Sequence, residues 1–470
     1  MANTRSDAIV LFGASGDLAK KMTFVSLYHL AERGKLDMPI VGVAFSNWND
    51  DSLRKNAKAD IEKVLGKKVK ASVWNAMAKR MTYVQGDYTK PDTYERLKTA
   101  LGGAKRPLFY LEIPPSLFEV TVQGLYDSGL SKNARVVVEK PFGYDLASAR
   151  KLNANLSKMI TQDQLYRIDH YLGKSAVENI MVFRFANRLI EPLWRGEHIK
   201  SVMITMSESF GVADRGSFYD AVGALKDVVQ NHIMQITGLL AMEPPTKATP
   251  EAIHIEQTKV FDAMRPLTKA NYVRGQYDGY LKVKGVKKTS KTETYSAMRI
   301  DIDSWRWAGV PLFIRAGKSM ATTATEVVVQ LKRPPLALFD QAGCAHPEHN
   351  LIRLQIGPTP GVRLRLQAKD PDGGMTSQAF ILESDFEEQL GAAPLPYELL
   401  LDDALSGDHT LFATQEMIEG TWKVLAPVLK DPGPVYKYKV GTMGPKQADS
   451  LVKGYGGWVD PIARSSDSPA

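Results

Sequence analysis

The sequence is poor in cysteine, in long apolar runs and in blocks of charge. Its 470 residues include one cysteine, Cys344, which excludes an internal disulfide framework and fits a reducing compartment. No stretch approaches the ~18 consecutive apolar residues that a membrane helix needs. The short polar start, Met1–Asp7, leaves no room for a signal peptide. We therefore expect a cytoplasmic protein that does not bind membranes.

The positive charge is scattered along the chain. The formal net charge is +8 and the isoelectric point is near 9.1, yet Lys and Arg form no long basic block and no stripe interleaved with aromatic residues. A nucleic-acid-binding protein is expected to show such a stripe or a recognisable module. A positive field of this kind suits anionic small molecules equally well. We expect a small-molecule partner and no nucleic acid.

Length and pattern predict two domains of different class. At 470 residues and 52.0 kDa the chain exceeds the roughly 150 residues of one domain. Apolar strands alternate with helix-like stretches up to about residue 170, which predicts a doubly wound parallel α/β sheet. Later strands alternate in polarity, which predicts an α+β domain with a mainly antiparallel sheet. We place a Rossmann-like dinucleotide-binding domain at 1–170 and a substrate-binding and oligomerisation domain at 171–470. The expected strands of the first domain are Ala8–Phe12, Pro39–Ala44, Arg80–Gln85, Pro107–Ile113, Ala134–Glu139 and Gln164–Ile168.

A glycine turn follows the first of these strands and leads into a helical pattern. Strand, glycine turn and helix form the dinucleotide-binding fingerprint in its proper context. Gly16 and Ala19 reproduce the second half of G-x-G-x-x-G/A, whereas Gly13 lies three residues upstream of Gly16 instead of two. The predicted cofactor-binding residues of this turn are Gly13, Ala14, Ser15, Gly16, Asp17 and Leu18.

The fifth strand ends in Glu139-Lys140-Pro141-Phe142-Gly143. Ligands of parallel sheets bind at this carboxyl edge. Lys140 and the rigid Pro141 could therefore fix an ammonium beside a nicotinamide and a substrate oxygen. A salt-bridged strand end is the alternative on these residues alone.

The segment Arg167–Lys174 concentrates an acid, an imidazole, a phenol and an amine just after the last strand of this pattern. If Gly173 and Lys174 lay in the first turn of the following helix, backbone N–H groups and the helix dipole would favour a phosphate there. A solvated helix start with a local Asp–His hydrogen bond is the competing interpretation.

The second domain adds an acid and a histidine in apolar surroundings. Glu208 ends the strand Lys200–Glu208 on an otherwise apolar face, where a carboxylate needs a partner. His232 lies on the core stripe of a helix expected over 220–242, and such a histidine is more often a core residue than a catalyst. Asp227 and His232 would be roughly 140° apart on a regular helix. If both side chains were to reach one ligand, the ligand would have to wrap around the helix or the helix would have to widen by a local π-turn.

A metal site is not expected. Cys344, His346 and His349 have metal-like spacing, but they lie in a Pro- and Gly-containing loop without a second ligand pair. A structural zinc site needs four ligands.

Taken in order, these motifs resemble those of glucose-6-phosphate dehydrogenases. The resemblance runs nearly end to end, through Trp305-Arg306-Trp307 to Gly444-Pro445, and includes Arg315-Ala316-Gly317-Lys318. The segment Arg167–Lys174 is highly specific to that family. The resemblance implies oxidation of D-glucose 6-phosphate at C1 to 6-phospho-D-glucono-1,5-lactone, the first step of the oxidative pentose phosphate pathway.

The resemblance also implies roles for individual residues. His232 corresponds to the base that takes the O1 proton, Asp169 to its carboxylate partner and Lys140 to a lysine near O1 and the nicotinamide. The phosphate-binding positions are His170, Tyr171 and Lys174. The positions that hold the rest of the sugar are Glu208, Asp227 and Lys318.

The sequence departs from the family pattern in three places. Phe45 and Ser46 stand where an arginine usually follows the second strand, Met22 replaces a lysine of the first helix, and Thr323 replaces a basic residue. Phe45 could stack on adenine, and no carboxylate is present there to repel a 2′-phosphate. We therefore predict a nicotinamide cofactor with dual specificity, NADP first because the family usually prefers it and NAD also usable.

Two other functions stay open at this stage. An oxidoreductase of the glucose–fructose oxidoreductase type would share the Rossmann-plus-sheet plan and a Glu-Lys-Pro motif. A catalytically silent regulatory paralogue is conceivable because of the three departures, although Asp169, His232 and Lys140 are intact. The family resemblance also implies a homodimer or homotetramer.

Overall fold

The computed structural model describes residues 5–336, 338–339 and 347–462. The chain forms two compact units. Unit 1 contains the residues up to Lys174, Pro245–Ile255 and Pro394–Glu419, and unit 2 contains Ser175–Pro244, Glu256–Ala393 and the residues from Gly420 on. The boundary placed between residues 170 and 171 stays a prediction. No sequence pattern had linked the two later segments to unit 1.

Unit 1 is built on a six-stranded, all-parallel sheet in the order β3-β2-β1-β4-β5-β6. Its strands are β1 (Ala8–Phe12), β2 (Ile40–Ala44), β3 (Met81–Gln85), β4 (Pro107–Leu111), β5 (Arg135–Val138) and β6 (Leu165–Arg167). The continuous apolar runs are buried because helices cover a parallel sheet on both faces. The strand order reverses at β1, and ligands bind at such a switch point. The predicted doubly wound sheet is confirmed.

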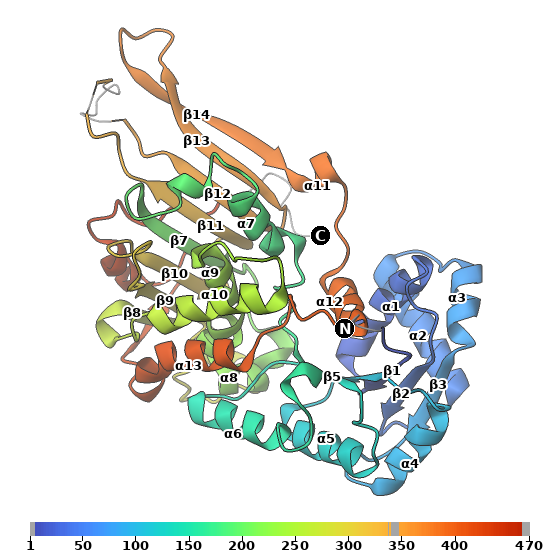
Figure 1. The fold of residues 1–470 in the computed structure, drawn as a ribbon. Coiled ribbons are helices and arrows are strands. Elements are labelled where there is room, and N and C mark those ends of the chain that lie inside the picture. Colours follow the sequence, from blue (N-terminus) through green and yellow to red (C-terminus); the bar gives the residue numbers. More distant parts are fainter. Residues whose placement is uncertain (1–4, 337, 340–346, 463–470) are drawn as a thin grey trace. The chain divides into compact units, whose positions relative to one another are not determined.

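One helix of unit 1 comes from much later in the chain. The helices of this unit are α1 (Phe24–Glu32), α2 (Asp50–Leu65), α3 (Ala71–Ala78), α4 (Pro91–Ala100), α5 (Phe118–Asp127), α6 (Leu146–Leu156) and α12 (Pro396–Ser406). Figure 1 shows α12, in orange, beside α1, in blue. Glu398 of α12 is buried and paired with Arg33 at 2.8 Å and with His29 at 3.3 Å. These partners compensate the buried carboxylate and fix α12 in place.

Unit 2 contains a nine-stranded mixed sheet in the order β14-β13-β12-β11-β7-β10-β9-β8-β15. Its strands are β7 (Ile199–Ser207), β8 (Tyr272–Tyr277), β9 (Tyr295–Ile300), β10 (Leu312–Gly317), β11 (Ala324–Leu331), β12 (Leu351–Gly357), β13 (Gly361–Lys369), β14 (Ser377–Asp385) and β15 (Val435–Tyr438). Most neighbours are antiparallel, but β7 pairs with β10, and β8 with β15, in parallel. The expected α+β class with a mainly antiparallel sheet is confirmed.

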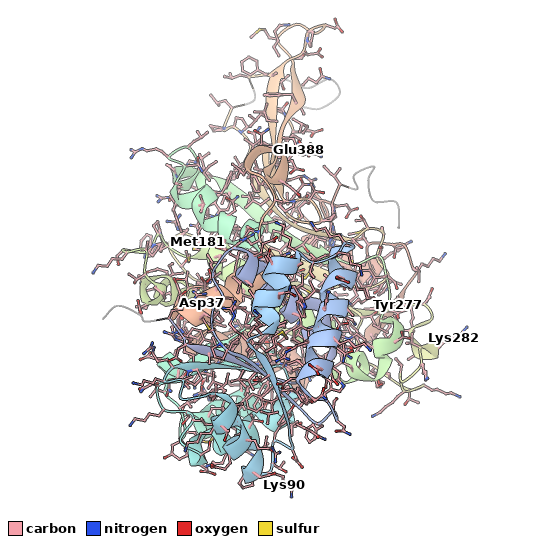
Figure 2. All side chains as sticks on the ribbon, turned by 90° about the vertical axis from the view of Figure 1, so that its right-hand side faces the viewer. Asp37, Lys90, Met181, Tyr277, Lys282 and Glu388 are labelled. Carbon is pink, nitrogen blue, oxygen red and sulfur yellow. The ribbon has the colours of Figure 1, made fainter. Side chains whose placement is uncertain are left out.

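The remaining α-helices of the described residues are α7 (Ser175–Phe185), α8 (Gly216–Ala224), α9 (Met234–Ala241), α10 (Pro250–Ala263), α11 (Phe386–Leu390) and α13 (Gln415–Lys430). The long hairpin of β13 and β14 is followed by α11, which carries Glu388 (Figures 1 and 2). Within the described ranges, no helix combines the length and the apolar character that crossing a bilayer would require.

Candidate active site

The turn after β1 brings the backbone close to the end of β4. Gly13 has φ +88°, and a Cβ there would lie 2.3 Å from the carbonyl oxygen of Glu112. Only glycine fits this conformation and this approach. The chain then enters a helix that widens into the π-helix η1 (Ala19–Thr23) before α1. At Gly13 the turn therefore has the close backbone approach, without a side chain, that a dinucleotide-binding turn requires.

The ends of β2 and β3 carry aromatic and neutral polar groups. Phe45 is 55% exposed, and its ring meets Tyr88 edge to face at 4.8 Å between centroids. The hydroxyls of Ser46 and Ser15 are 2.8 Å apart. Tyr83 donates a hydrogen bond of 2.8 Å to the carbonyl oxygen of Ser46. The predicted cofactor residues Ser15 and Ser46 are thus linked, and the Phe45 ring remains accessible for stacking.

A cavity of about 1030 Å³ opens beside these residues. Phe45, Trp48 and Tyr83 contribute rings to its wall, and Asp50, Asp51, Asp87 and Arg96 contribute charges. Arg96 is held by Asp92 at 2.6 Å and by the carbonyl oxygen of Gln85 at 2.8 Å. Since the one guanidinium of this wall is already bound, acidic groups dominate the surroundings of the cavity.

The carboxyl end of β5 presents Lys140 and Pro141, joined by a cis peptide bond. Glu139, immediately before them, accepts a hydrogen bond of 2.6 Å from the Tyr110 hydroxyl. Burial is the main cause that raises the pKa of Glu139 to about 7, and the Tyr110 hydroxyl and the Lys140 ammonium oppose this shift. The strand end is therefore an ionisable site built on a partly buried carboxyl group, which neither sequence interpretation includes.

The segment after β6 forms a tight turn from Asp169 to Lys174. Asp169 is 3% exposed and accepts a hydrogen bond of 2.9 Å from the backbone N–H of Tyr171. The Lys174 ammonium lies 4.0 Å from the centroid of the Tyr171 ring, and the His170 ring runs within 10° of parallel to Tyr397. Unit 1 thus gathers all four predicted side chains of this motif in one turn.

The position of this turn differs from one sequence expectation. The following helix α7 begins only at Ser175, so Gly173 and Lys174 precede it instead of lying in its first turn. A Cβ on Gly173 would lie 2.6 Å from the carbonyl oxygen of Pro396. The close approach of α12 therefore leaves no room for a side chain at position 173.

In unit 2 the helix expected over 220–242 is divided into three parts. Gly223 interrupts α8 with φ +74° and ψ 171°, and Leu225–Ile233 then forms the π-helix η6 before α9 begins. Glu293 accepts a hydrogen bond of 3.2 Å from the N–H of Leu225. Its carboxylate also occupies the space where a Gly223 side chain would lie. The kink thus depends on this glycine and on a distant carboxylate.

The π-helix confirms the hypothesis of a local widening. Its backbone hydrogen bonds join residues five apart, and Asp227 and His232 are separated by that interval. The two side chains therefore emerge from the same face. His232 is 4% exposed, so a polar ring is held in a nearly dry position.

Glu208 and Lys318 form an ion pair in unit 2. Glu208 directly follows β7 and Lys318 directly follows β10, where Ser207 and Gly317 are in register. The Lys318 ammonium also lies 5.2 Å from the ring centroid of Phe210. The partner that the sequence requires for Glu208 is therefore identified, and both predicted residues come together at the end of the parallel strand pair.

Sequence reasoning missed several polar residues beside these motifs. Tyr110, Glu112 and Tyr397 surround Glu139 in unit 1. Burial, first of all, raises the pKa of Glu112 well above its usual range. A signal existed for Glu112, since an acid directly after an apolar parallel strand lies at the ligand-binding edge. No such signal existed for Tyr397, which arrives on a helix from a remote part of the chain.

The metal-like loop is only partly visible. Cys344 and His346 lie outside the described residues. His349 is described: its Nδ1 is 2.8 Å from the carbonyl oxygen of Leu331, and its Nε2 is 3.1 Å from the Lys200 ammonium. The absence of a metal stays a prediction.

Comparison with known families covers almost the whole chain. The family described as "Glucose-6-phosphate dehydrogenase, NAD binding domain" matches residues 10–179, and "Glucose-6-phosphate dehydrogenase, C-terminal domain" matches residues 181–459. Glucose-6-phosphate 1-dehydrogenase 1 of Mycobacterium tuberculosis is 46% identical over 98% of this chain and 98% of its own length.

Solved structures give the same result. A glucose-6-phosphate 1-dehydrogenase from Mycobacterium avium superposes with a TM-score of 0.90 at 45% identity, covering 98% of this chain and 100% of the other. A glucose-6-phosphate dehydrogenase in complex with glucose 6-phosphate gives a TM-score of 0.90 at 33% identity with the same coverage. The alternative of a glucose–fructose oxidoreductase type is therefore not favoured, and this chain belongs to the glucose-6-phosphate dehydrogenase family.

Proposed function

We propose that this protein oxidises D-glucose 6-phosphate at C1 to 6-phospho-D-glucono-1,5-lactone, the first step of the oxidative pentose phosphate pathway. The observation that carries the proposal is the match of both family domains over residues 10–459, apart from residue 180. A nicotinamide cofactor, when bound, supplies the hydride acceptor for this oxidation. The Gly13 turn, which a Cβ would obstruct, fits such a cofactor.

We assign the general base to His232 and its carboxylate partner to Asp169. Oxidation at C1 releases one proton from the O1 hydroxyl, and His232 would accept it as the C1–H bond breaks. An Asp169 carboxylate beside the ring would orient the imidazole and stabilise the imidazolium that forms. Both side chains are buried, which favours a fixed geometry and excludes competing water. Lys140 would hold O1 and the nicotinamide end of the cofactor, next to Pro141.

We assign the phosphate group to the turn after β6. His170, Tyr171 and Lys174 offer an imidazole, a phenolic hydroxyl and an ammonium within one tight turn. These groups are hydrogen-bond donors that suit a dianionic phosphate. The cation–π contact of Lys174 on Tyr171 holds the ammonium near the turn before substrate arrives.

We assign the remaining sugar hydroxyls to Glu208, Asp227 and Lys318. The Glu208–Lys318 ion pair supplies a carboxylate acceptor and an ammonium donor together, and a sugar hydroxyl can satisfy both at once. Asp227 adds a second carboxylate on the face of η6 that also carries His232. Acceptors and donors placed in this way match a polyhydroxylated ring.

The cofactor proposal is dual specificity, with NADP named first and NAD also used. The described groups near Phe45 and Ser46 include no unengaged arginine, because Arg96 is bound by Asp92 and Gln85. The exposed Lys21 is 3.5 Å from Asp17. A 2′-phosphate would therefore meet two serine hydroxyls instead of a fixed guanidinium, beside a wall that also carries Asp50, Asp51 and Asp87. NAD carries no phosphate there and would meet no such charge repulsion.

We further propose a cytoplasmic homodimer or homotetramer without a metal. The oligomer is supported by β14, where Phe380, Ile381 and Leu382 are 38%, 49% and 50% exposed. Exposed apolar side chains on a long strand are a liability that a second copy would cover.

The test is an assay of reduced nicotinamide formation with glucose 6-phosphate, run separately with each cofactor. We expect turnover with both cofactors, and turnover with free glucose only at far higher concentration. Absence of turnover with glucose 6-phosphate, in a protein that binds the cofactor, would support the silent-paralogue alternative.

A further inference from the structure

Two acidic side chains lie next to one another at the carboxyl edge of the parallel sheet. Glu112 directly follows β4 and Glu139 directly follows β5, and the last residues of these strands, Leu111 and Val138, are in register. Both carboxyl oxygens of Glu112 are buried, and burial is the main cause that raises the pKa of each of the two groups. Two neighbouring carboxylates in such surroundings cannot both be ionised without a large cost in free energy.

The two acids have different partners. Glu139 accepts a hydrogen bond of 2.6 Å from the Tyr110 hydroxyl. It also interacts with the Tyr397 hydroxyl of α12 and is attracted electrostatically by the Lys140 ammonium. In the described part of the chain, neither carboxyl oxygen of Glu112 has a hydrogen-bond partner. Burial raises the pKa of Glu112 and the nearby Thr23 hydroxyl opposes this shift to a smaller extent, but no hydrogen bond of acceptable geometry joins the two groups. Donors and a cation favour a charge on Glu139, whereas nothing comparable favours a charge on Glu112.

We propose that Glu112 and Glu139 hold one proton between them, with Glu112 neutral and the Glu139 carboxylate serving as the counter-charge that positions the Lys140 ammonium. The proposal deepens the function proposed above and rests on it for the role of Lys140. In this role Glu139 is a positioning residue, since it acts on the substrate through its neighbour in the chain. Because Glu112 stays protonated, the pair of acids carries one negative charge, and that charge lies on Glu139.

The groups around Glu139 define how it responds to pH. They are Tyr110 from β4, Lys140 from its own strand end, Asp169 from the turn after β6 and Tyr397 from α12. Tyr110, Tyr397 and Lys140 favour the carboxylate, whereas burial and Asp169 favour the neutral acid. Protonation of Glu139 near pH 7 would remove the counter-charge, so substrate turnover should decline as the pH falls through this range.

Infrared spectroscopy tests the proton without relying on catalysis. We expect a C=O stretching band of a protonated carboxyl group in the native protein at about pH 8, where ordinary carboxyl groups are ionised. The band should be lost in Glu112→Gln and retained in Glu95→Gln, a matched control at an exposed position of α4. A native protein without the band, or a band that persists in Glu112→Gln, would overturn the proposal.

Steady-state kinetics test the positioning role. Tyr110→Phe removes a donor to the carboxylate, so the acid limb of kcat/KM should move upward by about one pH unit, while activity recovers at higher pH. Glu139→Gln should lower kcat/KM roughly 10–100-fold through loss of a charged contact. Glu95→Gln should match the native profile.

An unshifted limb in a folded Tyr110→Phe, or native kinetics in Glu139→Gln, would show that Lys140 needs no such counter-charge. If no variant and not even the native protein turned over glucose 6-phosphate, the proposed function would fail. The infrared result would still decide whether the acids share a proton.

Discussion

The two sheets of this molecule place their functional groups by the same rule, although they differ in class. In unit 1 all strands are parallel, so many strand ends meet at one edge, where Glu139, Lys140 and the turn at Asp169 lie. In unit 2 most strands are antiparallel, yet Glu208 and Lys318 follow β7 and β10, which are a parallel pair. Parallel pairing therefore explains both groupings, and the antiparallel strands serve mainly as support.

The two units differ in the structural elements that carry their predicted site residues. Unit 1 needs only strand ends and turns, because its edge already gathers many groups. In unit 2 the predicted residues Glu208 and Lys318 follow one of its two parallel pairs, β7 and β10. Asp227 and His232 come instead from a widened helix, η6, which follows the kink at Gly223. The unit with fewer parallel strand ends thus relies on an irregular helix, which is costly and often functional.

The strongest test of this comparison removes the imidazole from the widened helix. His232→Ala should lower kcat by about 10²–10⁴ because general-base catalysis contributes on that scale, while affinity for glucose 6-phosphate should change little. His198→Ala, outside the assigned residues, serves as the control. A His232→Ala enzyme within tenfold of the native kcat, measured at saturating substrate, would favour a role for His232 as a core residue only.

The same experiment can be extended to the carboxylate of unit 1. Asp169→Asn should act through the base, so the double variant should lose far less than the product of the two single losses. Independent, multiplicative effects on kcat would show that Asp169 and His232 do not work as one group.

Most of the fold could be predicted because the periodicity of apolar residues along the sequence agrees with the burial of the strands in the structure. Every strand expected before residue 170 is present within one or two residues of its expected bounds, since continuous apolar runs in a parallel sheet leave little ambiguity. The π-helix could be proposed only because Asp227 and His232, both expected to reach one sugar, would point in different directions on a regular helix. Gly223 and Glu293, which produce it, could not be connected, since their contact joins positions far apart in the sequence.

The same limit applies to the site of unit 1. Ser15, Lys140 and Asp169 stand beside recognisable strand ends, so their neighbourhood could be predicted. Tyr397 arrives on α12, and no local pattern shows that residues 394–419 pack with the first 174 residues. The surroundings of Glu139 depend on packing between segments far apart in the chain, and such packing cannot be predicted from a single sequence.

The phosphate-binding turn of unit 1 gives a second test. Lys174→Ala should remove a charge-assisted contact of ~1.5–3 kcal/mol, which is a roughly 10–150-fold weaker affinity for glucose 6-phosphate. Free glucose should bind almost as before, and Lys151→Ala on α6 is a control for charge alone. Equal losses for both sugars in binding titrations would mean that Lys174 is structural.

The kink of unit 2 can be broken without touching a proposed ligand. Gly223→Ala forces a Cβ into a left-handed conformation and to within 2.5 Å of the Glu293 carboxylate. We expect a loss of about 1–3 kcal/mol in the free energy of unfolding together with a fall in kcat, because η6 begins two residues later. Gly309→Ala, also at positive φ but with nothing within 4 Å, separates backbone strain from the clash. Equal losses in the two variants would show that the contact with Glu293 contributes nothing.

The smallest expected effect concerns cofactor choice at the β2 end of unit 1, where strand ends alone determine the site. Discrimination for NADP normally uses a cation at the 2′-phosphate, and discrimination for NAD uses a carboxylate at the ribose. Ser46, bonded to Ser15 at 2.8 Å, provides neither, so native kcat/KM values for the two cofactors should be comparable. Ser46→Arg should shift their ratio toward NADP by at least tenfold, since a charged contact contributes ~1.5–3 kcal/mol. Ser46→Gln, long but neutral, should shift it much less. A native enzyme that already prefers NADP more than a thousandfold would show that a cation elsewhere in the chain recognises the phosphate. In that case the residues at the strand ends would not determine cofactor choice.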